Sequence, residues 1–525
     1  TRNIAIGAFT YDASDTENDN LAIGYQAMTT NTAGGTKNIA IGNYALDALT
    51  SGDTNTAVGH NAMTLHTTGA NNVAVGERAL AASTTGAQNT AIGGTALIAL
   101  TTGASNTAVG YAAAGATTTA ANNTAVGLDA LAANVTGAGN TAIGKDSMKV
   151  SLGNNNTAVG MNALLANTTG GSNVAIGQGA LDSSTTASAN VAVGEGTLAA
   201  VTTASENTAV GHTAGTVTTG RRNSFFGYRS GLANTSGYNN TFVGHMALQA
   251  NTTANDNTAI GFNAMKANTT GADNVAVGPY ALDALSTGDQ NIAIGRHALG
   301  ATTGSDNIGI GQTALYVNTT GTRNIAIGTN CLDASDTESD NISIGYTAMT
   351  VMNSGAEKCT IIGTYAGDAL TSGDANNAFG YNALGATTTG YSNVAIGNSC
   401  HLVATSGNKN TAVGVDSALA HTTGDENVHI GNQAGKHTTT AAECVIIGSV
   451  AGSSTTNLVN GNQNVIIGAH CHTSATDSGN QIVIGYNVAG NGNNTFAFGE
   501  SGNDSAISFG ATSISAPSDI RLKEN

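Results

Sequence analysis

The sequence of 525 residues contains no tryptophan and only two prolines, and just 9% of its residues are charged and 4% aromatic. A disordered chain would carry more charge and fewer β-branched residues. A conventional globular core would need more leucine and phenylalanine. The chain is instead rich in glycine, with 70 residues, and in alanine, threonine and asparagine. This composition indicates a repetitive β structure with tight turns.

Two further features are scarce, namely clustered basic residues and long apolar runs. The 16 lysines and arginines form no long basic run, and the formal net charge is −17. We therefore expect no binding to nucleic acid. No stretch approaches the roughly 20 apolar residues of a transmembrane helix, so we expect no membrane insertion. No signal peptide is visible. Residue 1 already falls inside a repeat, which makes us expect a cut end there.

An internal repeat occupies almost the whole chain. The run Asn55–Gly59 recurs at residues 72–76 and 106–110. The glycines that close these runs follow one another every 17 residues, with occasional steps of 16 or 18. The unit reads Asn-(Thr/Val/Ile)-Ala-(Val/Ile)-Gly-x-x-Ala-Leu-x-x-x-Thr-Thr-Gly-x-x. A fixed period of this kind is typical of stacked repeat architectures.

Each position of the unit supports a structural interpretation. The residue before the closing glycine is always apolar, so we expect it to point inward. The alanine before it suits a place where another backbone approaches closely. The later Ala-Leu or Ala-Met pair, such as Ala62 and Met63, marks a second short apolar segment. Thr-Thr-Gly provides the return turn. The recurring asparagines are expected to stack as a ladder that satisfies backbone groups in the turns.

These readings predict an all-β fold, a 17-residue-repeat parallel β-roll or β-solenoid of about thirty coils. Two short strands and two turns fit one unit, and stacking at strand spacing gives a long rod of about 140 Å. One coil alone buries very little apolar surface. We therefore expect lateral partners as well as stacking partners, so the fibre should be an oligomer. The residues alone do not fix the number of chains.

The Asn-x-Ala-(Val/Ile)-Gly-x-x-Ala unit resembles the repeat of trimeric adhesin head domains, over about residues 1–452. In that family each chain forms a left-handed parallel β-roll and three rolls pack around one axis. The resemblance therefore implies a homotrimer, with longer turns in this chain because its unit is longer. Beyond it, residues 453–517 have irregular glycine steps, including 20, 14 and 11. We expect an irregular β tip or junction there.

The last eight residues, Ser518–Asn525, resemble the opening of the intramolecular chaperone domain that ends many phage tail fibres and tailspikes. That domain drives trimerisation and is then released by self-cleavage, in which a serine and a lysine five residues later are implicated. The resemblance places Ser518 and Lys523 in those roles, with Asp519 beside the serine. A hydroxyl needs a base or strained geometry to act as a nucleophile at neutral pH.

Several residues depart from the repeat. Cys331, Cys400 and Cys471 take an alanine position, and Cys359 and Cys444 take the asparagine position, so buried free thiols are expected.

His470 and His472 form the only His-x-His and are the weak candidates for a metal, though we expect none. A cluster at 221–244 belongs either to a variant coil with a larger core or to a receptor or glycan site. Its members are Arg221, Arg222, Phe225, Phe226, Tyr228, Arg229, Tyr238 and Phe242.

Together these features favour a structural fibre that projects host-recognition surfaces, most simply a phage or virus tail fibre. Its expected partners are two further copies of itself, a host-surface receptor or glycan and an upstream virion component. Its expected location is the virion or the extracellular space. The alternatives are a cellular surface adhesin or filament subunit and, more remotely, an ice-binding solenoid. We expect no cofactor and no substrate turnover apart from self-cleavage, because acidic residues are scattered and no nucleotide loop or nucleophile elbow occurs.

Overall fold

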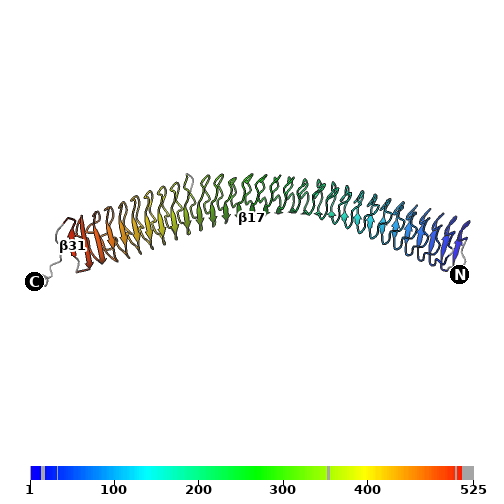
Figure 1. Ribbon diagram of the computed structural model, residues 1–525, viewed down its shortest axis with the longest axis horizontal. Helices are drawn as coiled ribbons and strands as arrows, with labels where there is room; N and C mark the ends of the chain where they lie inside the picture. Colours follow the sequence, from blue (N-terminus) through cyan, green and yellow to red (C-terminus); the bar gives the residue numbers. More distant parts are fainter. Residues whose placement is uncertain (1, 13–17, 32, 352–354, 503–504, 511–525) are drawn as a thin grey trace, which may run out of the picture. The chain divides into compact units, whose positions relative to one another are not determined.

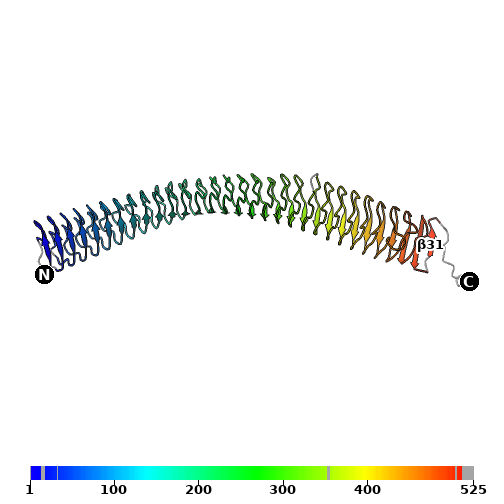
Figure 2. The ribbon, with the colours of Figure 1, turned by 180° about the vertical axis from the view of Figure 1, so that it is seen from behind.

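The structure is a computed structural model that describes residues 2–12, 18–31, 33–351, 355–502 and 505–510. The chain divides into two compact units, Thr1–Asn263 and Ala264–Asn525. Each unit is a stack of coils, and a coil is the segment from one closing glycine to the next (Figures 1 and 2). The strands of unit 1 are β1 (Ile4–Ile6), β2 (Leu21–Ile23), β3 (Ile39–Ile41), β4 (Thr56–Val58), β5 (Val73–Val75), β6 (Thr90–Ile92), β7 (Thr107–Val109), β8 (Thr124–Val126), β9 (Thr141–Ile143), β10 (Thr157–Val159), β11 (Val174–Ile176), β12 (Val191–Val193), β13 (Thr208–Val210), β14 (Ser224–Phe226), β15 (Thr241–Val243) and β16 (Thr258–Ile260).

Unit 2 continues the same pattern and ends in longer strands. Its strands are β17 (Val275–Val277), β18 (Ile292–Ile294), β19 (Ile308–Ile310), β20 (Ile325–Ile327), β21 (Ile342–Ile344), β22 (Thr360–Ile362), β23 (Asn377–Phe379), β24 (Val394–Ile396), β25 (Thr411–Val413), β26 (Val428–Ile430), β27 (Val445–Ile447), β28 (Val465–Ile467), β29 (Ile482–Tyr486), β30 (Thr495–Glu500) and β31 (Ser505–Ser508). Parallel pairing continues from β27 through β30, across the expected boundary at residue 452. Only then does β31 pair with β30 in antiparallel orientation.

The strands pair in parallel and in register within each unit, which confirms the predicted parallel β-solenoid. Ala57 of β4 faces Ala74 of β5, and Ala74 faces Ala91 of β6. Equivalent residues therefore lie side by side in successive coils, about 4.8 Å apart as in any β-sheet. No helix occurs among the described residues. The core of each unit is a column of repeated side chains enclosed by the coils.

The asparagine ladder is confirmed as the inner support of the turns. The N–H of Asn55 donates to Oδ1 of Asn38 at 2.8 Å, and the N–H of Asn72 donates to Oδ1 of Asn55 at 3.0 Å. The Nδ2 amide of Asn55 donates to the carbonyl of Gly69 at 2.9 Å. These asparagines are fully buried. Each one satisfies backbone groups that the coil encloses and that would otherwise lie in the core without partners.

The expectation that the residue before the closing glycine points inward is wrong. In β6, Ala91 is buried, whereas Ile92 is 40% exposed. A strand points successive side chains to opposite faces, so only one of the two enters the core. The alanine enters because the opposite wall of the coil lies close to it. The valines and isoleucines consequently form a row on the outer surface of the sheet.

The second apolar segment is buried as expected, but it is not a second strand. Ala62 and Met63 are fully buried. However, Asn61 and Met63 have left-handed backbone conformations, with φ of 57° and 51°. The N–H of Met63 still reaches the next coil and donates to the carbonyl of Ala79 at 3.0 Å. The coil therefore has one short strand and a series of tight turns, and stacking offsets the strain of the left-handed residues.

The closing glycine permits the close approach of successive coils. Gly93 has φ of +133°, and a Cβ atom there would lie 2.4 Å from the carbonyl oxygen of Gly110 in the next coil. The following residue, Gly94, has open space instead, because its nearest neighbour is a ring atom of Tyr111 at 3.4 Å. The position of the closing glycine thus has no room for a side chain, whereas the position after it does.

We expect Gly93→Ala to destabilise the surrounding coils by about 2 kcal/mol or more, because the new Cβ meets backbone and the positive φ is strained. Hydrogen exchange of the amides in residues 76–110 measures the loss of protection. Gly94→Ala is the matched control and should leave protection unchanged. Equal protection in both variants would contradict the close packing of the closing glycines.

A second prediction concerns the ladder where cysteine replaces asparagine. The N–H of Asn464 donates to the sulfur of Cys444 at 3.4 Å, which is a weak bond. Cys444→Asn supplies an amide oxygen instead and should raise the unfolding free energy by about 1 kcal/mol. Urea denaturation of the full chain measures it. Cys400→Ala, which removes a thiol from an alanine position, should not stabilise, and a loss of stability in Cys444→Asn would contradict the ladder argument.

Candidate functional site

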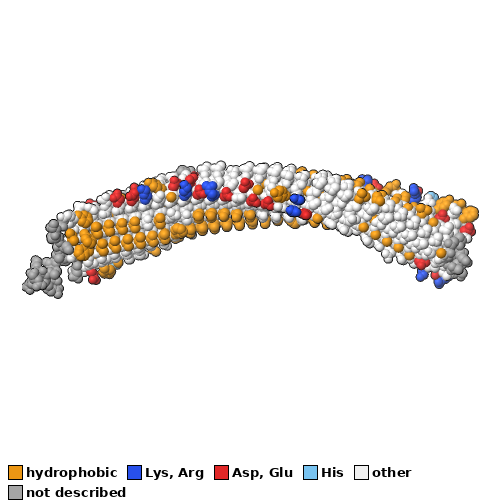
Figure 3. Space-filling model, viewed as in Figure 1, with side chains coloured by type: hydrophobic (Ala, Val, Ile, Leu, Met, Phe, Trp, Pro, Cys, Tyr) orange, Lys and Arg blue, Asp and Glu red, His pale blue; other side chains and the backbone are white. Residues whose placement is uncertain are grey.

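The most extensive surface feature is the outward apolar row, which consists of the residues that precede the closing glycines. Isolated exposed apolar side chains are ordinary, but a continuous row of them is typical of an interaction surface. Figure 3 shows such rows as parallel orange lines along unit 2. The row's most exposed members include Ile6, Val75, Ile92, Ile143, Ile176, Phe226, Val243 and Ile260 in unit 1, and Ile294, Phe379, Ile396, Ile430, Ile467 and Ile484 in unit 2.

Exposed rings follow the closing glycines and stack from coil to coil. In unit 1 the ring centroids of His212 and Tyr228 lie 5.6 Å apart, those of Tyr228 and His245 5.0 Å, and those of His245 and Phe262 5.2 Å. The rings are within 22° of parallel. The guanidinium of Arg229 lies 5.1 Å from the centre of the Tyr228 ring. The repeat places these rings one strand spacing apart, so stacking follows from the register.

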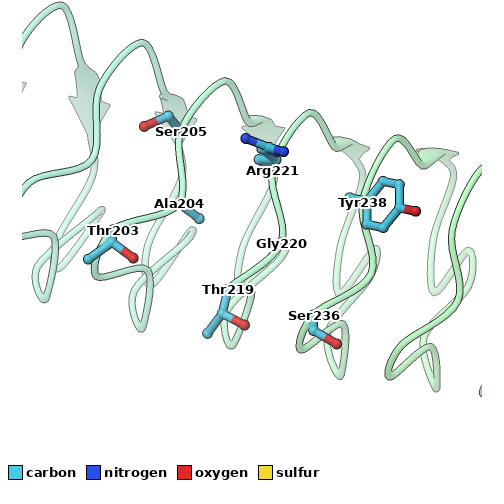
Figure 4. A pocket seen from close by; sticks show the side chains of 8 residues that line it. All are labelled: Thr203, Ala204, Ser205, Thr219, Gly220, Arg221, Ser236 and Tyr238. Atoms are coloured by element: carbon cyan, nitrogen blue, oxygen red, sulfur yellow. The ribbon is translucent and has the colours of Figure 1, made fainter.

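The structure distributes the predicted recognition residues over two places. Tyr228 and Arg229 belong to the ring stack. Arg221 lines a groove of about 360 Å³ in unit 1 together with Thr203, Ala204, Ser205, Thr219, Gly220, Ser236 and Tyr238 (Figure 4). Arg222, beside it, is held by an ion pair of 2.7 Å with Glu206. Arg221 and Arg222 therefore differ in their surroundings although they are adjacent.

A second groove of unit 1, of about 500 Å³, presents both signs of charge. Its lining includes Glu77 and Arg78 on one coil, with His60 and Leu65 on the coil before it. Because a carboxylate and a guanidinium share this groove, its charge gives no clear preference for an anionic or cationic ligand.

The prediction of a variant coil with a larger core is confirmed for Phe225 and Phe242. Both are fully buried at positions where alanine usually stands, and their ring centroids lie 5.3 Å apart. Space for them comes from Gly231, where a Cβ would lie 2.4 Å from Phe225. Leucine or methionine usually occupies the Gly231 position. Ile361 with Gly367 and Ile446 with Gly452 repeat this exchange of large and small residues.

Sequence reasoning missed a cluster of three buried histidines in unit 2. His401, His421 and His429 come from two successive coils and from three different positions of the unit. Ring centroids of His401 and His421 lie 5.1 Å apart, and those of His421 and His429 lie 5.8 Å apart. Only His421 has a clear partner for its ring, the carbonyl of Gly424 at 2.8 Å from Nε2. The available signal was His429 in an alanine position with Gly435 opposite.

Burial lowers the pKa of all three imidazoles. The pKa of His401 falls well below its usual value through burial, and then through the neighbouring His421 and His429. Burial and His421 lower the pKa of His429 to about 3. Burial also lowers the pKa of His421, although the Gly424 carbonyl and Asp425 oppose the shift. All three are therefore neutral at pH 7.

The His-x-His motif does not form the strand arrangement that the weak metal hypothesis needs. His470 lies in a turn, where its ring meets that of Tyr486, whereas His472 forms a single β-bridge with Ala489. Its Nδ1 lies 3.0 Å from the carbonyl of Thr473. Within the part of the chain that the structure describes, no three histidine, cysteine, aspartate or glutamate side chains are placed so that they could hold a metal ion together.

All five cysteines are buried, as the repeat register predicts, and their thiols are free. Burial raises the pKa of Cys331 and Cys359 to about 11 and that of Cys400 to about 12. A thiol that stays protonated at neutral pH is a poor nucleophile. These cysteines are therefore core residues. The self-cleavage candidates Ser518, Asp519 and Lys523 lie outside the described residues.

Comparison with protein-family models and with curated proteins gave no match for the chain. Among the described residues, no helix has the length and apolar character needed to cross a membrane. The functional argument consequently rests on the surfaces described above.

The histidine cluster predicts acid sensitivity. The folded-state pKa values are lowered, so the unfolded chain binds more protons as the pH falls below about 6.5. Stability is therefore complete above this pH and is lost towards lower pH, by up to about 2 kcal/mol per histidine at pH 5. Urea denaturation of the full chain between pH 7.5 and 5 measures the loss.

The matched variant is His429→Ala with Gly435→Leu, which restores the usual pair of the repeat. It should reduce the loss of stability between pH 7.5 and 5, while His429→Ala alone should leave a cavity and destabilise at both pH values. A pH dependence that is identical in the parent and the double variant would show that His429 does not contribute to it.

Proposed function

We propose that this chain is a structural fibre protein whose copies associate side by side through the outward apolar row. The observation that carries the proposal is that this row follows coil after coil with large β-branched side chains half exposed. Contact between these apolar side chains and water is unfavourable, and it recurs in every coil of the row. A partner with the same period would cover all of the row at once.

The apolar surface area that a partner would cover supports this proposal. Covering one such side chain removes on the order of 60 Å² from water and contributes roughly 1.5 kcal/mol. A dozen of them give on the order of 700 Å² per partner, which approaches the 800 Å² per partner of stable interfaces. Because β-branched side chains are stiff, little rotamer entropy is lost when they are covered.

Three copies around one axis are the arrangement implied by the resemblance to adhesin heads, and we propose this homotrimer. The ring stacks and grooves on other edges of the coil would then stay exposed for recognition of a host receptor or glycan. A phage or virus tail fibre at the virion surface fits this arrangement and the chaperone-like ending Ser518–Asn525. No turnover of substrate is proposed beyond self-cleavage at that ending, and a cellular adhesin remains the alternative.

A solitary ice-binding solenoid is the second candidate, because one observation favours it. The first strand position in β6 to β10 is always threonine, which gives a regular outer row of hydroxyls in unit 1. The accompanying row holds valine or isoleucine, so the pattern is Thr-x-Val and not Thr-x-Thr. This face is available to ice only if no other chain covers it.

We expect light scattering to give a mass about three times 51.7 kDa for the full chain. Ile92→Lys, Ile143→Lys and Ile176→Lys together should lower the temperature at which the chains dissociate, because burying an unpaired charge is costly. The triple control Tyr111→Lys, Leu128→Lys and Met161→Lys alters apolar residues that are equally or more exposed but follow the closing glycine.

The control should leave both mass and dissociation temperature unchanged. A monomeric mass would sink the proposed assembly, and thermal hysteresis in such a monomer would support the ice-binding alternative. An oligomer weakened only by the control substitutions would place the interface on the residues that follow the closing glycines instead of on the outward apolar row.

A further inference from the structure

The groove lined by Arg221 and Tyr238 owes its existence to one shortened coil. The coil from Gly211 to Gly227 has 16 residues, whereas each of its two neighbours has 17 and a longer return turn. The turn glycine Gly220 follows its closing glycine by nine positions, while Gly237 follows Gly227 by ten. The turn containing Thr219, which lines the groove, is thus one residue shorter than the turns on either side.

The shortened turn leaves donors of the preceding coil without acceptors. In a regular pair of coils the second threonine of the turn donates to the next coil, as Thr186 N–H does to the carbonyl of Thr202 at 3.3 Å. The equivalent N–H of Thr203 has no acceptor among the described residues. Thr203 lines the groove, so its donor lies at the groove's edge.

A second set of donors belongs to the residues that follow the turn. In several other coils the equivalent N–H groups donate to a side-chain oxygen at the same position of the next coil. Ser188 donates to Oγ of Ser205 at 3.0 Å, and Ala272 donates to the carboxylate of Asp289 at 2.7 Å. Asn408 likewise donates to the carboxylate of Asp425 at 2.8 Å. The chain itself therefore shows that this N–H position binds carboxylates.

Within the groove this position is occupied by residues that supply no acceptor to the N–H group of the coil before. Arg221 and Tyr238 follow Ser205 in successive coils, and an arginine side chain has no acceptor. The N–H groups of Ser205 and Arg221 accordingly find no acceptor in the described parts of the chain. Two backbone donors thus face positions at which other coils supply an oxygen, and an exogenous carboxylate oxygen suits them.

The guanidinium of Arg221 adds a positive charge at the same place. Among the described residues it forms no ion pair, whereas the nearby Glu206 is paired with Arg222. Figure 4 shows its side chain lying between Ser205 and Tyr238. A guanidinium beside backbone N–H groups is the usual arrangement for binding a carboxylate.

The remaining lining suits a sugar. The hydroxyls of Thr203 and Ser236 have no hydrogen-bond partner in the described residues, and Tyr238 is 43% exposed. Hydroxyl donors and acceptors beside an exposed ring match the polar edges and apolar face of a saccharide. The volume of about 360 Å³ is at the small end of ligand sites. An acidic peptide would leave the hydroxyls of this lining largely unused.

We propose that this groove binds a carboxylated saccharide, with its carboxylate on Arg221 and the N–H groups of Ser205 and Arg221 and its ring against Tyr238. The inference deepens the proposed function, since it names a ligand class for one surface that a fibre would present. It does not depend on the assembly through the outward apolar row, because solution mass and sugar binding are separate measurements.

The experiment is calorimetric titration of the full chain with tetragalacturonate and with sialyllactose, which separate a uronic from a sialic acid. Maltotetraose and lactose are the neutral probes, and tetraglutamate is the peptide probe. We expect one acidic sugar to bind and its neutral counterpart to bind at least about tenfold more weakly, since a charge-assisted bond is lost.

The chain supplies its own matched substitutions. The coil from Gly295 to Gly311 is also shortened, and there Ser305 and Thr322 occupy the places of Arg221 and Tyr238. Arg221→Ser and Tyr238→Thr therefore introduce residues that a short coil already carries, and both should fold. Each should weaken acidic-sugar binding at least about tenfold. Arg296→Ser, at an exposed arginine elsewhere, should leave binding unchanged.

Three results would overturn the proposal. They are failure of both acidic sugars to bind a chain of the expected mass, unchanged binding in Arg221→Ser, and tighter binding of tetraglutamate than of either sugar. The last result would assign the groove to acidic peptides. A circular dichroism spectrum equal to the parent's ensures that a loss of binding in the variants reflects the groove.

Discussion

The structure depends on the hydrogen bonds that join each coil to the next one at equivalent positions of the repeat. The N–H of Thr56 donates to the carbonyl of Asn72, and the N–H of Asn72 donates to Oδ1 of Asn55. Because the spacing between coils is that of a sheet, any group that is repeated in sequence is stacked in space. Threonine rows, ring stacks, the asparagine ladder and the outward apolar row are four consequences of this single constraint.

The same constraint explains where variation is tolerated. At the closing glycine nothing larger fits, because the next backbone lies in the place of a side chain. In the core a large residue is accepted only when a glycine opposite makes room, as Gly231 does for Phe225 and Gly435 for His429. In the turns a lost residue opens a groove without disturbing the strands on either side. Function can therefore change locally while the register of the stack is kept.

The surface that we propose for ligand recognition arises from an interruption of the repeat. A regular position supplies its own acceptor to the coil before it, as Asp289 does for Ala272. Where arginine takes that position the acceptor disappears and a positive charge replaces it. A fibre of uniform coils would offer only repeated surfaces, which suit association with further copies. Isolated departures such as Arg221 suit a small ligand, because they combine donors that occur together at that one place.

The sequence by itself determined the 17-residue step, the parallel stacking, the asparagine ladder and the burial of cysteines and of Phe225, because each follows from period and from residue size. It did not determine which of two alternating residues enters the core, so Ile92 was expected inside and lies outside. It also suggested a second strand in the segment where the backbone of Met63 has a left-handed conformation. His401, His421 and His429 gave no signal together, since their positions in the unit differ. Only the closed coil decided these points, because the distance to the opposite wall sets which side chain fits and which positions meet.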